Sequence, residues 1–252
     1  MNGITAIILA AGMGVRMGPR GRLRPKGLIE LGGVPLVRQS VDCLRQRGFG
    51  RIVIVTGHLS EQYEAEFSDS DVTLIHNPHY ATTGSLRTLL VALGHVSGAC
   101  VILESDLIYA PQALDTISEN ASRLITSGTT GAGDEVYVWT KPERGAELLV
   151  EISKQKTALS QPFYGELVGI TGLTAAAMAL LPDVARRVLS RDPEQHYEHG
   201  LVALAHEIAI EVVRIDDLPW AEIDDEEMLK RAADQVFPRV KAARIASLGP
   251  TL

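Results

Sequence analysis

Glycines and cations are concentrated in one short stretch near the start of the chain. LAAGMGVRMGPRGRLRPKGL, residues 9–28, holds five glycines, four arginines and one lysine. Bare glycine N–H groups approach phosphate oxygens closely, and arginine and lysine side chains neutralise phosphate charge. The stretch therefore predicts a site for several phosphate groups, with a solvated basic loop as the alternative.

The spacing of these glycines departs from two common phosphate-binding motifs. The stretch lacks the GxxxxGK[ST] motif of ATPase P-loops, and Met17 stands where the dinucleotide motif GxGxxG, begun at Gly12, requires its last glycine. Neither an ATPase nor a dinucleotide-binding fold is supported. What remains is GxGxR on a proline-bounded loop, followed by four more cations, Arg20, Arg22, Arg24 and Lys26.

The segments around this loop alternate between strand and helix patterns. ITAIILA (4–10) is a continuous apolar run, typical of a central parallel strand buried on both faces. Apolar residues at three- and four-residue intervals predict an amphipathic helix over 34–47. The same patterns predict strands at 51–56, 72–76 and 99–106 and helices at 60–67, 84–93 and 111–125. In such folds ligands bind at the carboxyl ends of the strands, where the loop lies.

The second half of the chain has a different pattern. The Gly/Thr-rich loop 127–135 is followed by predicted strands at 135–140, 147–153 and 164–171. Helices are then predicted at 174–190 and 195–209, and a strand at 210–215. A last helix begins at an Asp-Glu-Glu cluster, and we expect the last dozen residues to be a frayed tail. We therefore predict an α/β fold with a Rossmann-like mixed, mainly parallel sheet and a smaller mixed or antiparallel lobe.

Composition limits the classes of partner. The chain has 252 residues, 46% of them hydrophobic, and a net charge of −7, so we expect one domain without general attraction for nucleic acid or anionic membranes. The two cysteines, Cys43 and Cys100, argue against a disulfide scaffold, and the histidines show no zinc-binding spacing. We expect a cytoplasmic protein.

Several motifs together resemble a known enzyme family. LAAGMGVRMGPRGRLRPKGLIELGGVPLV resembles the LAAGxGxR…PK signature of nucleotidyltransferases that join an NTP to a phosphorylated small molecule. HNPHYATTGSLRTLLVAL, VILESDLIY, GDEVYVW, ISKQK and WAEIDDEEMLKRA are similar, in the same order, to segments of the small cytidylyltransferases that act on phosphocholine and 2-aminoethylphosphonate. The wording ESDLIY, SKQK and GDE is most similar to the phosphonate branch. The resemblance covers nearly the whole chain and implies the nucleotide-diphospho-sugar transferase type of fold.

The resemblance implies a magnesium site and a triphosphate site. Asp106, at the end of a predicted strand, and Asp224, before a predicted helix, match the paired metal aspartates of the family, and carboxylate oxygens suit Mg²⁺. A turn residue and a helix N-cap are the alternatives for these two aspartates, and Asp225 could replace Asp224 as the ligand. Arg16 would bind the leaving pyrophosphate and Lys26 the α-phosphate.

The resemblance also implies which residues surround the nucleotide. Thr82 to Ser85 open a predicted helix and match the segment that approaches the base, although a helix N-cap explains Thr83 or Ser85 as well. The predicted nucleotide-binding residues are Leu9, Ala10, Ala11, Gly12, Met13, Gly14, Arg16, Lys26, Thr83, Gly84, Ser85, Glu104 and Ser105. Glu104 has a second interpretation as a buried, hydrogen-bonded strand residue.

The acceptor is expected to bind in the second half of the chain. Lys154 and Lys156 alternate near a strand end, so both can face one phosphonate, with Lys154 also assigned to catalysis. An amine or trimethylammonium head would require aromatic faces and carboxylates. The candidates are Tyr137, Trp139, Tyr164, Glu166, Tyr197 and Glu198, with charge from Asp134 and Glu135, and core packing is the alternative for most of the aromatic residues.

The leading hypothesis is a Mg²⁺-dependent cytidylyltransferase that converts CTP and a small phosphonate, 2-aminoethylphosphonate first, to the CMP-phosphonate and pyrophosphate. Phosphocholine or another small phosphomonoester is the alternative acceptor, and a non-catalytic nucleotide-binding regulatory module is the alternative of another class. We expect one domain with a nucleotide-binding part (1–126), an acceptor-binding part (127–225) and a C-terminal helix and tail (226–252). CTP and the phosphonate are the expected small-molecule partners, and we expect no binding to nucleic acid or membranes. A homodimer is the expected assembly.

Overall fold

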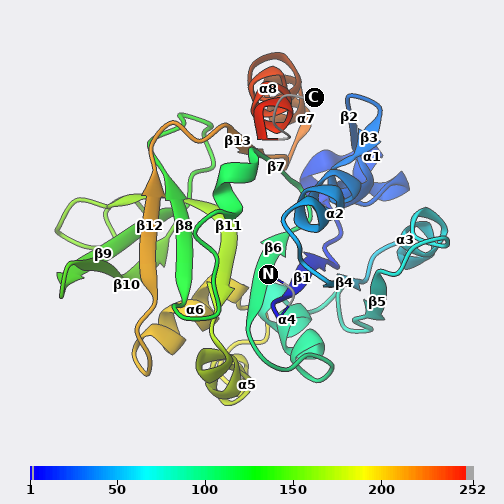
Figure 1. Ribbon diagram of the computed structural model, residues 1–252. Coiled ribbons are helices and arrows are strands. Elements are labelled where there is room, and N and C mark those ends of the chain that lie inside the picture. The colour runs from blue at the N-terminus through cyan, green and yellow to red at the C-terminus, as the bar shows by residue number, and fades with distance from the viewer. Residues whose placement is uncertain (2, 248–252) are drawn as a thin grey trace.

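A single twisted sheet runs through the whole molecule (Figure 1). The computed structural model describes residues 1 and 3–247. Within that part of the chain, nine strands form this sheet in the order β5-β4-β1-β6-β11-β8-β12-β10-β9. Their bounds in chain order are β1 (Thr5–Ala10), β4 (Arg51–Thr56), β5 (Thr73–His76), β6 (Cys100–Glu104), β8 (Arg123–Ser127), β9 (Tyr137–Glu143), β10 (Ala146–Ser153), β11 (Gly165–Leu173) and β12 (Glu211–Ile215).

The direction of the strands changes between β6 and β11. β5, β4, β1 and β6 run parallel, as the strand–helix alternation predicts. β11 is antiparallel to β6 and to β8, and β12 is parallel to β8. β9 and β10 form a hairpin at the far end of the strand order, where β9 also pairs with β11. The mixed α/β fold class is confirmed, and the predicted second lobe is a continuation of the same sheet.

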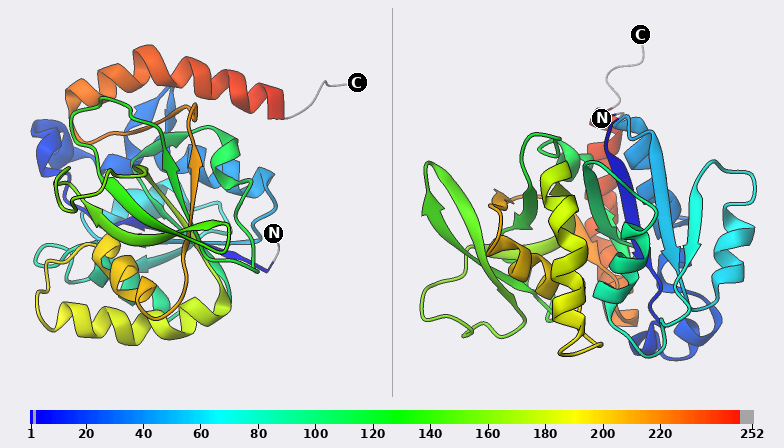
Figure 2. Two further views of the ribbon diagram at one scale, coloured as in Figure 1. Left: turned by 90° about the vertical axis from the view of Figure 1, so that its left-hand side faces the viewer. Right: turned by 90° about the horizontal axis from the view of Figure 1, so that it is seen from below.

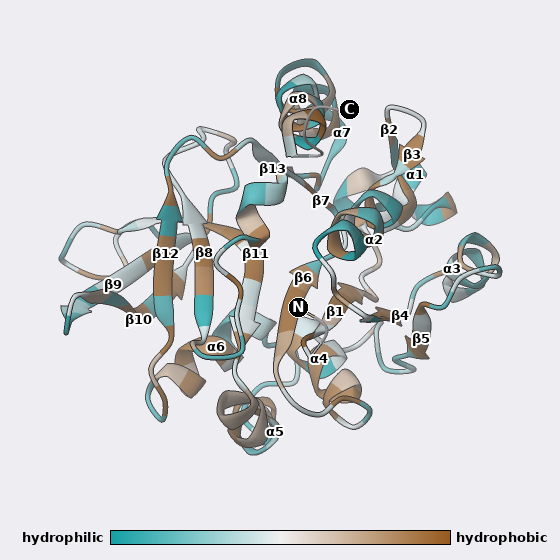
Figure 3. Cartoon of the chain, in the orientation of Figure 1, coloured by the Kyte–Doolittle hydropathy of each residue, from teal (hydrophilic) through white to brown (hydrophobic). Residues whose placement is uncertain are grey.

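Apolar side chains cover both faces of the sheet. In β1, Ala6 and Ile8 pack into one apolar cluster and Ile7 and Leu9 into the other, which accounts for the unbroken apolar run in the sequence. Figure 3 shows β1 and β6 as hydrophobic segments at the centre of the molecule. Helices α2 (Leu36–Gln46), α3 (Ser60–Glu66) and α8 (Phe237–Ser247) belong to one side, and α4 (Ser85–Leu93), α5 (Ala175–Leu189) and α6 (Tyr197–Ala205) to the other. Figure 2 shows α8 and α5 along opposite sides of the sheet.

Short elements bring distant segments to the carboxyl ends of the central strands. β13 (Trp220–Glu222) pairs with β7 (Leu107–Tyr109), directly after β6, so that the late segment 222–224 lies beside Asp106. The loop after β1 contains η1 (Val15–Met17), α1 (Pro19–Leu23) and η2 (Lys26–Leu28). The remaining short elements are β2 (Glu30–Leu31), β3 (Val34–Pro35), η3 (Pro111–Leu114), α7 (Glu226–Arg231) and the π-helical turn η4 (Ala232–Val236).

The predicted helix at 111–125 is wrong. Only η3 is helical there, and residues 123–127 form β8 between β11 and β12. Ala113, Leu114 and Ile117 are buried at helical spacing, which produced the misleading pattern. The polar run Ser-Glu-Asn-Ala-Ser (118–122) that follows consists mostly of residues that favour turns and caps over helix interiors.

The predicted frayed tail is wrong for residues 241–247. These residues continue α8, and Arg244 Nη1 donates a hydrogen bond to Gln39 Oε1 at 2.7 Å. Residues 248–252 lie outside the described part of the chain. None of the helices described is long and apolar enough to cross a lipid bilayer.

Candidate functional site

A cleft of about 540 Å³ opens at the carboxyl ends of β1 and β6. The register places Leu9 of β1 opposite Glu104 of β6, so the loops that leave these two strands meet at one point. The cleft is lined by all the predicted nucleotide-binding residues, 9–14, Arg16, Lys26, 83–85, Glu104 and Ser105. Asp106, Lys154, Tyr197, Glu198 and Asp224 also line it, so most of the residues singled out from the sequence lie together.

The glycine-rich loop is folded tightly over Lys26. Gly14 has a left-handed backbone, with φ of 60°, which glycine adopts without strain. A Cβ atom on Gly21 would lie 2.1 Å from the carbonyl oxygen of Gly14, so this close approach of two backbone segments requires glycine. The fold of the loop turns the side chains of Arg16 and Lys26 into the cleft.

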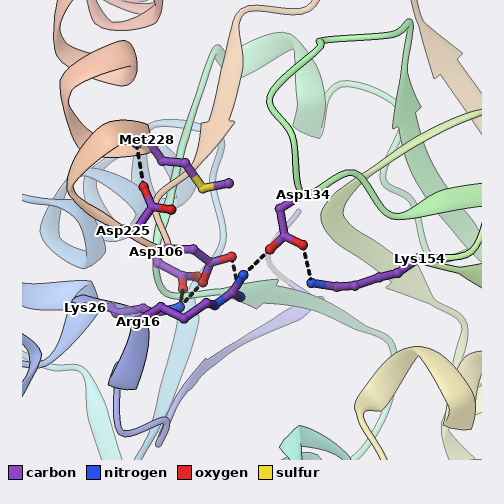
Figure 4. Close-up of polar contacts among 8 residues, drawn as sticks. Arg16, Lys26, Asp106, Asp134, Lys154, Asp225 and Met228 are labelled. Atoms are coloured by element: carbon purple, nitrogen blue, oxygen red, sulfur yellow. Dashed lines mark hydrogen bonds and ion pairs between the residues drawn. The ribbon is translucent and has the colours of Figure 1, made fainter. Parts of the chain in front are cut away.

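Lys26 lies between two aspartates (Figure 4). Its Nζ atom is 3.2 Å from Asp106 Oδ2 and also contacts Asp224 Oδ1. Asp224 is 1% exposed and receives a second cation, with its Oδ2 atom 2.6 Å from Arg16 Nη2. Burial alone would lower the pKa of Lys26, but the carboxylates of Asp106 and Asp224 outweigh burial and raise it. Lys26 is therefore held as a cation.

Asp225 has a different role from Asp224. Its side chain caps α7, where Oδ1 accepts a hydrogen bond from the Met228 backbone N–H at 2.8 Å (Figure 4). The helix N-cap considered for Asp224 therefore belongs to its neighbour. Of the two, Asp224 is the carboxylate that lines the cleft.

Further carboxylates surround Asp106. Carboxylate oxygens of Glu104, Asp106 and Glu222 lie within 4.8 Å of one another. Burial, with repulsion from Glu198 and Asp106, raises the pKa of Glu104 to about 8 even though Tyr197 donates a hydrogen bond to it at 2.6 Å. Burial, with repulsion from Glu104, Asp106 and Asp224, also raises the pKa of Glu222. Such a concentration of oxygen ligands with unfavourable mutual repulsion fits a divalent cation of the Mg²⁺ type.

The segment predicted to approach the base lies against the start of α6. Gly84 N–H donates to the carbonyl of Pro193, and a Cβ atom on Gly84 would lie 2.2 Å from the Glu194 carbonyl oxygen. Neither hydroxyl caps α4: Thr83 Oγ1 donates to the His79 carbonyl at 2.8 Å, and Ser85 Oγ accepts from Tyr197 N–H at 2.9 Å. The N-cap alternative for these two residues is therefore wrong.

Through Arg16, the ion pairs around Lys26 continue to the other side of the cleft. Asp134, in the loop before β9, accepts from Lys154 Nζ at 2.7 Å through Oδ1 and contacts Arg16 Nη1 through Oδ2 (Figure 4). Partial burial opposes ionisation of Asp134, but the hydrogen bonds from Lys154 and Arg16 prevail and lower its pKa. Lys154 thus faces the glycine-rich loop across the cleft.

Several predicted acceptor residues lie outside this cleft. Lys156 lies over the rings of Tyr137 and Phe163, with Nζ 5.7 and 5.4 Å from their centroids. Trp139 is fully buried and donates its indole N–H to the Gln161 carbonyl at 2.9 Å. The prediction that Lys154 and Lys156 face one phosphonate is wrong, because residues 154–156 leave β10 as a turn and the strand alternation ends at Ser153.

Glu166 also lies outside this cleft. It is 1% exposed, faces a small separate cavity of about 30 Å³, and its Oε2 atom accepts from Thr130 N–H at 2.8 Å. Burial raises its pKa. Glu135 and Asp134 line the same cavity, whereas Tyr164 stacks under Arg214, with Cζ 5.9 Å from the ring centroid.

The sequence reasoning missed several residues that line the cleft. Glu222 stands two positions before Asp224 on β13, so strand alternation could have identified it. His196 precedes α6, and burial together with the nearby Lys154 and Arg16 lowers its pKa. Tyr63 and Tyr80 come from segments without a recognisable signal and reach the cleft only through the fold.

The sequence is similar to those of several known proteins. The sequence matches the MobA-like NTP transferase domain over residues 6–155. It is 26% identical to the CMP-5'-(3-aminopropyl)phosphonate synthase of Streptomyces rubellomurinus, over 96% of this chain and 40% of that protein. It is 34% identical to the 2-aminoethylphosphonate cytidylyltransferase of Lancefieldella rimae, over 42% of this chain and 44% of that protein. The matches thus span less than half the length of these relatives.

A solved structure shows the same fold. The CTP:phosphocholine cytidylyltransferase of Streptococcus pneumoniae superimposes with a TM-score of 0.77 and 17% sequence identity. The superposition covers 92% of this chain and 98% of that one. The resemblance drawn from the sequence motifs to small cytidylyltransferases, and to the phosphonate branch among them, is confirmed.

Proposed function

The chain belongs to the family of MobA-like NTP transferase domains, and from this premise we propose that it is a Mg²⁺-dependent cytidylyltransferase. It converts CTP and a small phosphonate, 2-aminoethylphosphonate first among them, to the CMP-phosphonate and pyrophosphate. The choice of CTP and of a phosphonate rests on the names of the relatives, one of which is a 2-aminoethylphosphonate cytidylyltransferase.

One observation carries this proposal. Lys26 Nζ contacts the carboxylates of both Asp106 and Asp224 directly beside the glycine-rich loop. Nucleotidyl transfer brings two anions together at the α-phosphorus, so the site must supply positive charge from fixed cations and from a metal. Lys26 supplies a fixed positive charge, and the carboxylates around it can bind the metal ion at the same place.

The residues of the cleft have distinct roles in this reaction. Lys26 holds an α-phosphate oxygen, and Arg16, on the more exposed side, binds the departing pyrophosphate. Asp106 and Asp224 would hold Mg²⁺, with the carboxylates of Glu222 and Glu104 close by. When bound, Mg²⁺ neutralises phosphate charge and orients the phosphate oxygens. The acceptor oxygen is already ionised at neutral pH, so the reaction requires no general base to activate it.

The acceptor half of the cleft favours a cationic head group. Lys154 is the cation placed to bind the phosphonate. Besides the two aspartates assigned to the metal ion, the cleft contains three glutamates, Glu104, Glu198 and Glu222. Burial raises the pKa of each. An ammonium group that donates hydrogen bonds to them relieves this repulsion.

The same arrangement favours a primary amine over a trimethylammonium head. Of the aromatic residues expected to form a cage, Tyr137, Trp139 and Tyr164 lie outside the cleft, and Tyr197, which lines it, is buried and donates its hydroxyl to Glu104. A quaternary ammonium binds best to aromatic faces, whereas a primary ammonium can donate hydrogen bonds to carboxylates. This observation supports an aminoalkylphosphonate ahead of phosphocholine.

A panel of substrates tests the proposal. Pyrophosphate release is measured with Mg²⁺ and CTP against 2-aminoethylphosphonate, phosphocholine, 2-hydroxyethylphosphonate and glucose-1-phosphate, and again with UTP. We expect the highest kcat/KM for CTP with 2-aminoethylphosphonate. Preference for 2-hydroxyethylphosphonate would contradict the role of the carboxylates, and CTP binding without turnover of any acceptor would favour the regulatory alternative.

A further inference from the structure

Asp134 contacts two cations that the proposed function assigns to phosphate groups. Arg16 comes from the loop after β1 and Lys154 from the end of β10, 138 positions apart in the chain by residue number. One carboxylate bridges them, with one oxygen on each cation. Figure 4 shows Asp134 between the two side chains, above Lys26 and Asp106.

A substrate anion would need the same donors. An arginine or lysine N–H that donates to Asp134 cannot donate with full strength to a phosphonate or pyrophosphate oxygen at the same time. We propose that Asp134 is an internal competitor for the substrate anions: its carboxylate occupies the Arg16–Lys154 pair, and phosphonate or pyrophosphate binds by displacing it. The inference rests on the proposed function for the identity of the anions.

The ion pairs of Asp134 are of a kind that a substrate can displace. The side chains of Arg16 and Lys154 are 51% and 56% exposed. Exposed pairs are screened by water and contribute little free energy. A doubly charged phosphonate carries more charge than the carboxylate and offers three oxygens, so it is the stronger partner for the same cations.

The loop that carries Asp134 is anchored before and after this residue, and two glycines lie between the first anchor and Asp134. After Asp134, the Val136 carbonyl accepts from Leu167 N–H at 2.8 Å. Thr130 is held at its N–H by Glu166, at 2.8 Å, and at its carbonyl by Arg231, at 3.0 Å. Between Thr130 and Asp134 the backbone passes through Gly131 and Gly133, with φ of 65° and 97°. These conformations favour glycine, and glycine also permits the rotation that would withdraw the carboxylate from the cations.

A contrasting role makes the proposal testable. If Asp134 served only to orient Arg16 and Lys154, its removal would weaken anion binding. If it competes, its removal strengthens anion binding. The sign of the change therefore separates the two roles, and it is measured without turnover.

The test compares Asp134→Asn with the wild type by calorimetric titration of methylphosphonate and of inorganic pyrophosphate in magnesium-free buffer. We expect Asp134→Asn to bind both anions about two- to tenfold more tightly, the range for the loss of one or two exposed ion pairs. Asp183→Asn, on the exposed face of α5, removes the same unit of charge away from the cleft and serves as the matched control. We expect its affinity to match that of the wild type.

A double variant assigns the effect to the bridged cations. In a Lys154→Ala background, Asp134→Asn should produce a smaller gain for methylphosphonate, because one of its two partners is absent. Unchanged or weaker binding of both anions by Asp134→Asn, or binding too weak to measure in every variant, would overturn the proposal. A gain in anion affinity in a protein that releases no pyrophosphate from CTP would retain the competitor role and reject the proposed reaction.

Discussion

At the scale of single residues, Asp106 and Asp225 provide a matched comparison for the metal site. Asp106 forms an ion pair with Lys26, whereas Asp225 caps α7. We predict that Asp106→Asn lowers kcat by about 100-fold or more, since a metal ion supplies several kcal/mol of charge stabilisation. Asp225→Asn should retain near-normal turnover, because asparagine is also a good N-cap. Similar turnover in both variants would remove Asp106 from the active site.

Two lysines that the sequence could not separate are distinguished by their surroundings. Lys154 lines the cleft and contacts Asp134, while Lys156 lies over Tyr137 and Phe163. We predict that Lys154→Ala raises the acceptor KM about tenfold, as expected for loss of one charge-assisted hydrogen bond of about 1.5 kcal/mol. Steady-state kinetics on Lys156→Ala should give a KM close to that of the wild type. The reverse order would move the phosphonate to the outer lysine.

Glu166 has a buried carboxyl group, and its ionisation should make the free energy of unfolding depend on pH. Its folded-state pKa is raised by burial, so the folded protein binds a proton that the unfolded chain releases, and this group destabilises the fold as pH rises above its ordinary pKa. We predict that Glu166→Gln gains unfolding free energy relative to the wild type between about pH 5 and pH 8. Urea denaturation at several pH values measures the difference. A difference that stays constant or shrinks as pH rises would show that the carboxyl carries no burial penalty.

At the scale of elements, the start of α4 is fixed by close contact with the segment before α6. A Cβ atom on Gly84 would collide with the carbonyl oxygens of Glu194 and Gln195, at 2.2 and 2.3 Å. We predict that Gly84→Ala costs about 2 to 3 kcal/mol of unfolding free energy, because neighbouring backbone cannot yield as easily as a side chain. It should also raise the KM for CTP, since both segments line the cleft.

The other end of α4 supplies the control. Gly94 has a helical backbone, and the nearest atom to its added Cβ, the Val91 carbonyl oxygen, is 3.5 Å away. Gly94→Ala should therefore change the unfolding free energy by less than about 1 kcal/mol and leave the KM for CTP unchanged. Chemical denaturation and initial-rate kinetics on the two variants provide the comparison. Equal stability of both would mean that α4 shifts freely relative to α6.

At the scale of the whole molecule, local patterns predicted elements with strong local signals better than elements whose partners lie far away in the chain. The buried strands β1, β4 and β6 and helix α2 have strong periodic signals, and each was found within a few residues. The segment 111–125 failed because apolar spacing over one helical turn was extended across residues whose partners, β11 and β12, are supplied later in the chain. The pairing of β13 with β7, which carries Asp224 to Asp106, is also non-local.

The candidate site shows the same division. Residues within a motif, such as Arg16, Lys26 and Asp106, were identified from neighbouring sequence. Tyr63, His196 and Tyr80 became visible only when separate strands and loops met at the cleft. Trp139 was assigned to the acceptor because aromatic side chains suit a cationic ligand, but its alternation on β9 turns it into the core. The types of residue predicted the chemistry, and the pairing of the strands determines which of those side chains line the cleft.

The central claim is that the cleft transfers CMP from CTP to a phosphonate oxygen. Phosphorus NMR of a reaction containing the protein, Mg²⁺, CTP and 2-aminoethylphosphonate follows every phosphorus atom of both substrates. We predict that the phosphonate signal is replaced by a coupled phosphonate–phosphate pair as pyrophosphate appears in equal amount, and that EDTA stops the reaction. Release of orthophosphate with an unchanged phosphonate signal, or unchanged spectra from protein that binds CTP, would contradict the claim.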